Sequence, residues 1–274
     1  MDIIKSIVLG IIEGITEWLP ISSTGHLILA KEFLDFQNVG QDFWDFFLYV
    51  IQLGAILAVV SAFFKKLNPF SAKKSLKEKQ SGYRLWIKIV VACLPAAVLG
   101  LILNDTVEKY LENPLTVAIT LILYGVGFIV LETVNKNRKP KISNLSLLNL
   151  KTALIIGGCQ VLSIIPGTSR SGVTILGALL LGCSRYVAAE FSFFLAIPVM
   201  VGTSGLKLLK HGFNFTGMEI AVMIFGMLTA YIVSVACIKF LMGFVKKHDF
   251  KSFGYYRIAL GIVVFITFLE TGRG

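Results

Sequence analysis

Two carboxylates, four hydroxyls and an imidazole lie within the fourteen residues from Glu13 to His26, in an otherwise apolar stretch. Glu13 and Glu17 are four residues apart, so on a helix they share one face and can hold the same ligand. Pro20 ends that helix. The small hydroxyl-rich run at 22–25 can then turn and present backbone amides at the start of a following helix, where anions bind. Ionisable groups at membrane depth are costly and usually functional.

A second polar stretch runs from Pro166 to Thr174 and interrupts another apolar region. Gly167 and Gly172 permit tight turns and close approach of a ligand to the backbone. Between them, Arg170 carries a permanent planar charge that suits phosphate oxygens, with serines on either side. The alternative is a Pro/Gly kink whose arginine snorkels to the membrane interface. Arg170 lies more than ten residues from either end of a plausible span, which disfavours that alternative.

The carboxylate pair predicts a bound cation. Glu13 and Glu17 repel one another unless a cation or a shared proton lies between them, and hard oxygen ligands favour Mg²⁺ or Ca²⁺ bridging to phosphate. A partly solvated helix end is the alternative for this pair. His26 has the chemistry of an acid, a base or a nucleophile, and a structural, hydrogen-bonded histidine is its alternative.

Composition places these groups in a membrane protein. The chain has 274 residues, of which 55% are hydrophobic and 15% charged, with a mean hydropathy of +0.79. A soluble domain carries about 25% charge. The net charge of +10 fits cytoplasmic loops and anionic lipid, and no nucleic-acid-binding motif accompanies it, which excludes a nucleic-acid partner. The cysteines stand singly in apolar segments and are predicted to be buried and unpaired: Cys93, Cys159, Cys183 and Cys237.

The apolar segments predict an all-α polytopic membrane protein with about six transmembrane helices. They lie at 46–64, 85–103, 114–134, 191–209, 219–242 and 255–270. Basic residues crowd the connections at 65–84, 136–149 and 243–254, which predicts that these face the cytoplasm and both termini the outside. Residues 1–45 and 150–183 must then enter and leave on one side each, as two re-entrant helical hairpins or, less economically, as pairs of short spans. Broken backbone at membrane depth must be buried in protein or line a wet cavity.

The chain also contains an internal repeat within one membrane domain, 1–274. Pro20-Ile-Ser-Ser matches Pro166-Gly-Thr-Ser at an offset of 166 − 20 = 146, and Phe46-Phe-Leu matches Phe193-Phe-Leu at 193 − 46 = 147. We expect repeats at 1–135 and 147–270, each a re-entrant hairpin followed by three spans. An odd number of spans inverts the second copy, which gives an inverted-topology repeat.

Three strings resemble the signature of a known family. Glu13-x-x-x-Glu17, Pro20-x-Ser-Ser-Thr-Gly-His26 and Pro166-Gly-x-Ser-Arg-Ser-x-x-Thr174 are similar to those of the bacterial undecaprenyl-diphosphate phosphatases, the bacitracin-resistance proteins. The resemblance covers the whole chain, and 65–84 is its least family-like part. It implies hydrolysis of the C55 isoprenyl diphosphate at the outer face of the bacterial cytoplasmic (inner) membrane, recycling of the cell-wall lipid carrier, bacitracin resistance and a divalent cation.

The resemblance also implies roles for Glu13, Glu17, Ser23, His26 and Arg170, and the polar residues of the two turns complete the expected site. Glu13 and Glu17 are the expected metal ligands. The expected catalytic residues are Ser23, His26, Glu17 and Arg170. The expected phosphate-binding residues are Ser22, Thr24, Gly167, Thr168, Ser169, Ser171 and Thr174. For the nucleophile we favour the Ser23 hydroxyl, activated by His26, over attack by His26 itself or by water.

A carrier of lipid phosphates is the competing functional class, because inverted repeats with broken helices are the architecture of many transporters. A carrier needs Arg170 but neither Ser23 nor the glutamate pair, which favours the enzyme. The expected partners are the lipid substrate and membrane lipids. The oligomeric state stays open, with a homodimer among the assemblies the sequence allows.

Overall fold

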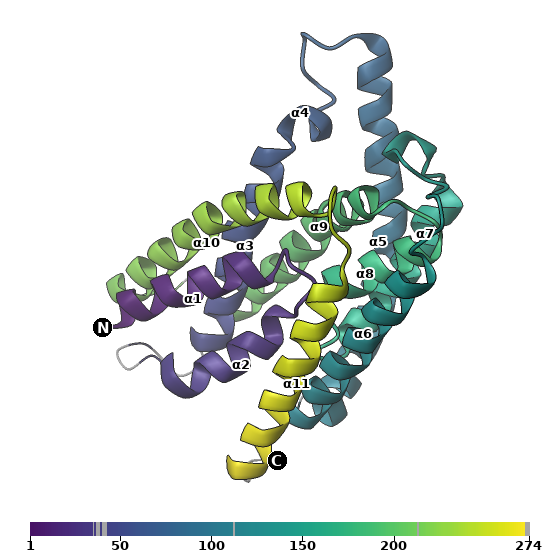
Figure 1. The fold of residues 1–274 in the computed structure, drawn as a ribbon. Coiled ribbons are helices and arrows are strands. Elements are labelled where there is room, and N and C mark those ends of the chain that lie inside the picture. Colours follow the sequence, from purple (N-terminus) through teal and green to yellow (C-terminus); the bar gives the residue numbers. More distant parts are fainter. Residues whose placement is uncertain (35, 37–38, 40–42, 112, 213, 272–274) are drawn as a thin grey trace.

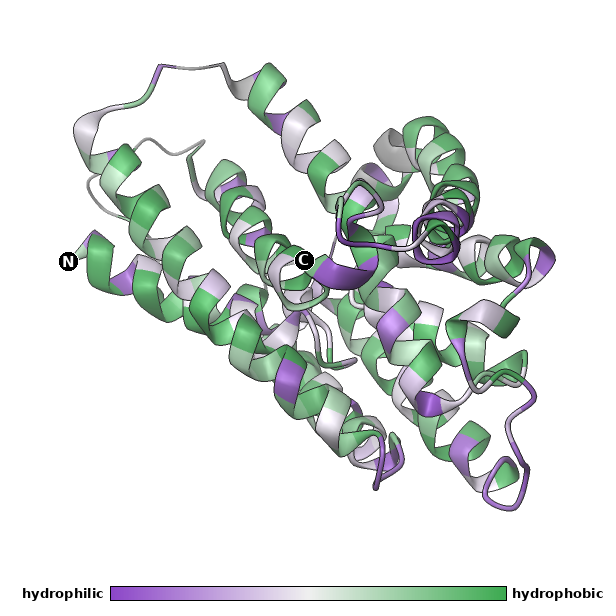
Figure 2. Cartoon of the chain, turned by 90° about the horizontal axis from the view of Figure 1, so that it is seen from above, coloured by the Kyte–Doolittle hydropathy of each residue, from purple (hydrophilic) through white to green (hydrophobic). Residues whose placement is uncertain are grey.

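The computed structural model describes residues 1–34, 36, 39, 43–111, 113–212 and 214–271, and its regular elements are all helices (Figure 1). Six of them are long and apolar enough to cross a membrane. These are α3 (Phe43–Ala62), α5 (Leu76–Leu111), α6 (Pro114–Val134), α9 (Arg185–His211), α10 (Gly217–Phe244) and α11 (Lys251–Thr271). They confirm the predicted polytopic, all-α fold. Their outer faces are apolar, and hydrophilic residues gather at their ends (Figure 2).

Helix α5 begins nine residues before the span predicted at 85–103. The cause is local, because Ser75 and Glu78 cap one another. The amide and the hydroxyl of Ser75 donate to Glu78 Oε2 at 2.8 and 2.7 Å, and the Glu78 amide donates to Ser75 Oγ at 3.3 Å. This reciprocal capping starts a helix. Several basic residues expected in the connection at 65–84 therefore lie on the first turns of α5.

The remaining helices are too short to cross a membrane. They are α1 (Asp2–Thr16), α2 (Ser23–Leu34), α4 (Phe64–Leu67), η1 (Leu145–Leu147), α7 (Leu150–Gln160), η2 (Val161–Ile164) and α8 (Arg170–Leu180). The longest has 15 residues, or about 22 Å at 1.5 Å per residue, against a hydrocarbon core of about 30 Å. α1 packs on α2 and α7 on α8, so each predicted hairpin is a pair of short helices joined by a turn.

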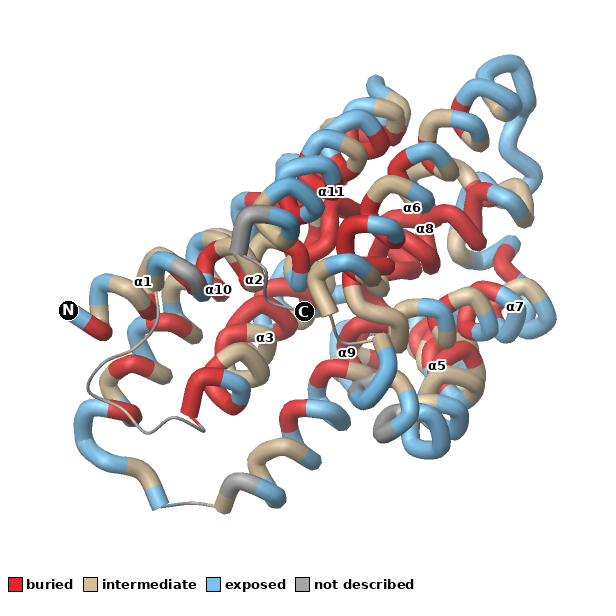
Figure 3. The backbone as a smooth tube through the Cα atoms, turned by 90° about the horizontal axis from the view of Figure 1, so that it is seen from below, coloured by how far each residue is buried: buried red, intermediate tan, exposed pale blue. Residues whose placement is uncertain are grey.

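Helix α8 of the second hairpin lies in the interior of the molecule. Every residue of α8 from Ser171 to Leu179 is buried, and α8 packs between α7 and α9 (Figure 3). α1 packs along α10, which in turn packs on α3. α2 contacts α6 and α11, and α8 contacts α6 and α9, so the polar turns that precede α2 and α8 lie among the long helices.

Two glycines bring α6 and α11 into backbone contact. A Cβ on Gly125 would lie 2.8 Å from the carbonyl oxygen of Gly254, and one on Gly254 would lie 2.7 Å from the carbonyl oxygen of Gly125. Small residues permit such close approach of helices in membranes. Arg257 follows Gly254 by three residues, so this crossing carries it into the interior, where it is 0% exposed.

The two halves of the chain present the same order of elements: a pair of short helices and then three long ones. Ser22 and Ser169 are the described residues other than glycine with positive φ, at 74° and 69°. They lie 169 − 22 = 147 positions apart. Each accepts a hydrogen bond from the amide three residues on, that of Gly25 or Gly172. The internal repeat stays a prediction, and these matching turns support it.

Candidate active site

The first hairpin turns sharply between Glu17 and Ser23. Helix α1 ends with Glu17 as its C-cap, and α2 starts at Ser23. Between them, Ser22 takes a left-handed conformation that residues other than glycine rarely adopt. Strain of this kind is concentrated at functional sites and persists only when the surrounding structure enforces it. The turn brings the last carboxylate of α1 onto the first hydroxyl of α2.

The second hairpin turns between Ile165 and Arg170 in a similar way. Ser169 caps α8 in a left-handed conformation, and its Oγ accepts from the Gly172 amide at 3.2 Å. Gly167 has φ +81°, and a Cβ there would lie 2.3 Å from Thr120 Oγ1 on α6. Glycine is therefore required at 167 both by its backbone conformation and by the close approach of α6.

The two turns meet at Glu17. One carboxylate oxygen, Oε1, accepts from Arg170 Nη2 at 2.9 Å, and the other, Oε2, accepts from the Ser23 hydroxyl at 2.9 Å. The side chains of Glu17 and Arg170 are each 9% exposed. A charge-assisted pair in a site with so little water is stronger than a surface pair. The structure therefore brings together three of the four expected catalytic residues.

Arg170 is fixed by further bonds. Its Nη1 donates to the Ser192 carbonyl of α9 at 2.7 Å, and its own carbonyl accepts from Thr174 Oγ1 at 2.8 Å. The Thr174 and Ser192 hydroxyls lie 2.7 Å apart. The Nε of Arg170 is buried and has no partner within the described ranges. The guanidinium is thus oriented by α1 and α9, and N–H donors beyond these two bonds remain for a ligand.

Hydroxyl groups continue the network from the second turn to the first. Ser171 Oγ donates to the Glu17 carbonyl at 3.3 Å, and the Ser169 and Ser171 hydroxyls lie 3.1 Å apart. Because Ser171 donates to the carbonyl, Ser169 donates to Ser171. These two expected phosphate-binding serines therefore lie beside Glu17, and they also join the two hairpins.

Glu13 lies one turn before Glu17 on α1 and is fully buried. Neither of its carboxylate oxygens has a hydrogen-bond partner among the described residues. An unpaired buried carboxylate is costly unless a proton or a cation compensates it. No group of three or more histidine, cysteine or acidic side chains that could hold a metal occurs in the described ranges. The chemistry of two carboxylates, one of them without a partner, fits a hard divalent cation such as Mg²⁺ or Ca²⁺.

His26 forms hydrogen bonds with residues other than Ser23, its expected partner. Its Nδ1 lies 2.7 Å from the Ser22 carbonyl, and its Nε2 lies 2.8 Å from the Tyr256 hydroxyl of α11, on which the ring stacks. A carbonyl only accepts, so Nδ1 carries a proton and, in the neutral ring, Nε2 accepts from Tyr256. We expected His26 to activate Ser23. Instead, Ser23 donates to Glu17, because the turn at Ser22 directs its hydroxyl toward α1.

The other expected phosphate-binding residues take different places. Ser22 is buried and accepts from the Gly25 amide at 3.4 Å, whereas Thr24 is exposed. Thr168 is buried, and its carbonyl, like that of Gly167, faces α11. In this structure the backbone of the second turn is therefore used to dock α11.

Arg257 supplies that docking contact. Its Nη2 donates to the carbonyls of Gly167 and Thr168, both at 3.0 Å, and its Nη1 donates to the Pro20 carbonyl at 3.3 Å. Its guanidinium also lies over the Tyr124 ring, 5.8 Å from the centroid. One buried side chain from the last helix thus holds both turns in register.

Comparison with known proteins gives the family. The family model described as "Bacitracin resistance protein BacA" matches residues 6–263. The chain belongs to this family. Among its relatives, the undecaprenyl-diphosphatase of Lachnoclostridium phytofermentans is 58% identical over 264 residues, which cover 96% of each chain. The undecaprenyl-diphosphatase of Acetivibrio thermocellus is 54% identical over 98% of each chain, and that of Enterococcus faecalis is 54% identical over 97% of each.

Three residues of this BacA family member escaped the sequence analysis: Arg257, Tyr256 and Ser192. Arg257 could have been identified from the sequence, because an arginine inside a predicted span is costly unless it has partners in the protein. Tyr256 and Ser192 could not have been identified in this way. A tyrosine near the end of a span is common at membrane interfaces, and a serine within a span packs readily between helices.

Proposed function

We propose that this protein is a membrane phosphatase that hydrolyses undecaprenyl diphosphate to undecaprenyl phosphate and inorganic phosphate. The observation that carries the proposal is the Ser23–Glu17–Arg170 arrangement, in a chain more than 50% identical over its whole length to proteins named undecaprenyl-diphosphatase. This reaction recycles the lipid carrier of cell-wall synthesis and confers bacitracin resistance.

Ser23 is the nucleophile in this proposal, and Glu17 is its base. Ser23 Oγ attacks the terminal phosphorus while its proton passes to Glu17 Oε2, 2.9 Å away. The bond between that phosphorus and the bridging oxygen breaks, and undecaprenyl phosphate leaves with the bond's electron pair. Glu17 gives this proton to the departing lipid phosphate and becomes a carboxylate again. It then takes a proton from a water molecule whose oxygen attacks the phosphoserine. The bond between phosphorus and Ser23 Oγ breaks, Glu17 returns the proton to Ser23, and inorganic phosphate leaves. Nucleophile and base at hydrogen-bond distance are the usual signature of covalent catalysis.

Arg170 stabilises the transferred phosphoryl group. Its Nη1 and Nη2 are held by Ser192 and Glu17, and its Nε is buried without a partner. Donors fixed in advance cost no reorganisation when charge develops in the transition state. Ser169 and Ser171 lie beside the same turn. Their hydroxyl protons are used within the protein, so each hydroxyl would have to rotate away from its present acceptor to donate to a phosphoryl oxygen.

Glu13 and Glu17 would hold a divalent cation, Mg²⁺ or Ca²⁺. Both Glu13 oxygens lack partners among the described residues, and each Glu17 oxygen keeps a lone pair after accepting one hydrogen bond. Bound there, the cation would neutralise part of the diphosphate charge and hold its oxygens. Glu13 does not contact Ser23, so its role is to ligate and not to transfer the proton.

His26 is a positioning residue in this mechanism. Its bonds to the Ser22 carbonyl and to Tyr256 hold the left-handed turn against α11. This turn sets the direction of the Ser23 hydroxyl. Loss of the imidazole would therefore lower activity by loosening this geometry, while the general base stays in place.

The protein's place in the cell follows from the distribution of basic connections. Basic residues crowd the connections at 136–149 and 243–254 and the first turns of α5, which supports a cytoplasmic location for these ends. The two hairpins then open on opposite sides of the bacterial cytoplasmic membrane, with the active site reached from the outer face. The substrate's tail would remain in the bilayer while its diphosphate enters between the hairpins.

The test is phosphate release from undecaprenyl diphosphate by the purified protein in detergent. Wild type should release phosphate, Ser23→Ala should be inactive, and a rapid acid quench with labelled substrate should trap phosphate on a Ser23 peptide. The matched control is Ser61→Ala, since the Ser61 hydroxyl bonds only its own helix, at the Ala58 carbonyl. Label on His26, or an active Ser23→Ala protein, would reverse the assignment of the nucleophile.

The same assay separates the enzyme from a carrier of lipid phosphates. A carrier moves its ligand between leaflets and releases no phosphate from a detergent micelle. Binding of the diphosphate without release of phosphate by the wild-type protein would therefore overturn the proposed activity.

A further inference from the structure

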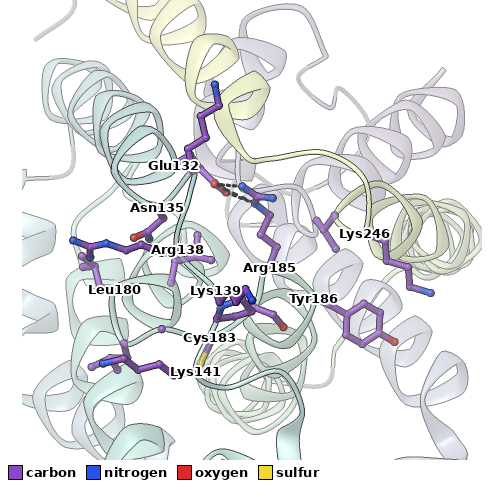
Figure 4. Close-up of a pocket in the computed structure, with 17 residues that line it drawn as sticks. Glu132, Asn135, Arg138, Lys139, Lys141, Leu180, Cys183, Arg185, Tyr186 and Lys246 are labelled. Atoms are coloured by element: carbon purple, nitrogen blue, oxygen red, sulfur yellow. Dashed lines mark hydrogen bonds and ion pairs between the residues drawn. The ribbon is translucent and has the colours of Figure 1, made fainter.

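A second polar cavity lies well away from the active site. It has a volume of about 420 Å³ and is formed by the end of α6 with the segment after it, the α8–α9 turn and the end of α10 (Figure 4). Arg170 and Leu180 stand at opposite ends of the 11-residue helix α8, so the cavity lies about 15 Å from the catalytic turn along this helix. It is a separate site.

The lining of this cavity is strongly basic. Its cations are Lys136, Arg138, Lys139, Lys141, Arg185 and Lys246, and its one carboxylate is Glu132. Glu132 is fully engaged: it accepts from Arg185 Nε and Nη2 at distances from 2.6 to 3.1 Å and from the Phe250 amide at 3.1 Å. The remaining five cations form no ion pair with any residue that the structure describes.

The lysines beyond α6 are held in place by backbone bonds. The amides of Lys141 and Ile142 donate to the Gly182 carbonyl at 2.9 and 3.0 Å, and the Ser184 amide donates to the Ile142 carbonyl at 2.8 Å. This short parallel bridge fixes the segment on the α8–α9 turn. The basic side chains therefore stand around a preformed cavity, with less conformational entropy to lose on binding than those of a free loop.

The start of α9 adds donors of its own. Ser184 caps the helix by accepting from the Val187 amide at 3.3 Å, and α9 runs for 27 residues from Arg185. The first amides of a helix have no partner within it, and the helix dipole favours an anion at this end. The Nε and Nη2 groups of Arg185 both donate to Glu132, and this ion pair holds the Arg185 side chain at the start of α9. Burial raises the pKa of the nearby Cys183 thiol to about 11, so this thiol stays neutral and does not repel an anion.

An apolar surface leads away from the basic cavity. Leu180, in its lining, is 70% exposed, and Val130 and Val134 of α6 are 54% and 55% exposed. The two valines are four residues apart and share one helix face. A free phosphate would have no use for this surface, whereas acyl chains would cover it. Basic pockets between membrane helices on the cytoplasmic side are typical sites for anionic head groups.

We propose that this cavity binds the phosphate head group of an anionic phospholipid, with its acyl chains along α6. The head group is held by the lysines, the α9 amides and Arg185. The site is distinct from the one that hydrolyses the substrate, and the lipid anchors the cytoplasmic ends of α6, α9 and α10 to one another. The proposal does not depend on the assignment of the catalytic residues.

The test is lipid retention by the purified full-length protein in native mass spectrometry. Dioleoyl-phosphatidylglycerol is compared with dioleoyl-phosphatidylcholine, and inorganic phosphate is added as a competitor. The test variant is Lys136→Gln/Lys139→Gln/Lys141→Gln. Wild type should retain phosphatidylglycerol in preference to phosphatidylcholine, and the triple variant should bind phosphatidylglycerol at least tenfold more weakly, because each cation near the head group contributes.

The matched control loses the same charge elsewhere. It is Lys73→Gln/Lys79→Gln/Lys151→Gln, whose lysines do not line the cavity. This control should bind phosphatidylglycerol like wild type, and all three proteins should unfold at the same temperature in phosphatidylcholine and release phosphate from substrate at the same rate in detergent. Equal weakening in both triple variants would overturn the proposal. Displacement of the lipid by millimolar inorganic phosphate would assign the cavity to free phosphate and would overturn it as well.

Discussion

Arg257 is the position at which a small change should have the largest effect on activity without touching the reacting groups. It is 0% exposed and donates to three carbonyls, two in the second turn and one in the first. Arg257→Met keeps the aliphatic part of the side chain and removes all three bonds. Arg257→Lys keeps the charge, but an ammonium group is a point donor and cannot bridge carbonyls on two turns as a guanidinium does.

The magnitude follows from the groups left behind. Each buried carbonyl that loses its donor costs about 1–3 kcal/mol, so the methionine variant should lose ~3 kcal/mol of stability or more. The two turns should also lose their register. A displacement of ~1 Å between Ser23 on the first turn and Arg170 on the second is expected to lower kcat on the order of 100-fold. KM should change less, because the tail of the substrate does not bind at Arg257.

The assay is phosphate release over a range of substrate concentrations, with thermal unfolding in the same detergent. Lys251→Met is the control, since it removes a cation from the first residue of the same helix. It should keep wild-type kcat and unfolding temperature. The lysine variant at 257 should remain more stable than the methionine variant and yet have a low kcat. An Arg257→Lys variant with wild-type kcat would refute the idea that the Arg257 guanidinium bridges the two turns.

Four other results are expected. Glu17→Gln removes the base that accepts the Ser23 proton, so phosphate release should fall by ~10² to 10⁴-fold, and retention of full rate would exclude this role. Arg170→Lys should lose about tenfold or more in kcat because it cannot donate in a fork, whereas equal rates would indicate a purely electrostatic role. Glu13→Gln should raise the Mg²⁺ concentration needed for half-maximal rate, and an unchanged titration curve together with full activity in EDTA would exclude ligation. A cysteine at Lys74 should resist an impermeant thiol reagent in intact cells; rapid labelling would invert the predicted orientation.

Much of the fold could be predicted from hydropathy alone. The six spans follow from runs of apolar residues near 20 in length, because a membrane helix must match the thickness of the bilayer. The early start of α5 was missed because the signal there is local. Ser75 and Glu78 cap the helix by side-chain bonds, which outweigh the polarity of the lysines that follow.

The residues that meet in the candidate site could be predicted, but their pairing could not. Glu17, Ser23 and Arg170 stand out as polar groups in apolar surroundings, and the structure brings them within hydrogen-bond distance. That Ser23 donates to Glu17 instead of His26 depends on the left-handed turn at Ser22. Spacing along a helix cannot reveal this, because Ser23 lies at the first position of α2 and the carboxylate belongs to the helix before the turn.

The polar groups of the site form hydrogen bonds between the two hairpins for a physical reason. Glu17 on the first hairpin takes one donor from its own turn, Ser23, and another from the second hairpin, Arg170. Arg257 then ties both turns to the last helix. Neither hairpin satisfies its buried charges alone, and an unpaired charge in this environment is costly. The candidate site therefore forms only when both halves of the chain are docked, and the same bonds that stabilise the docked halves place the Ser23 hydroxyl beside the Glu17 carboxylate.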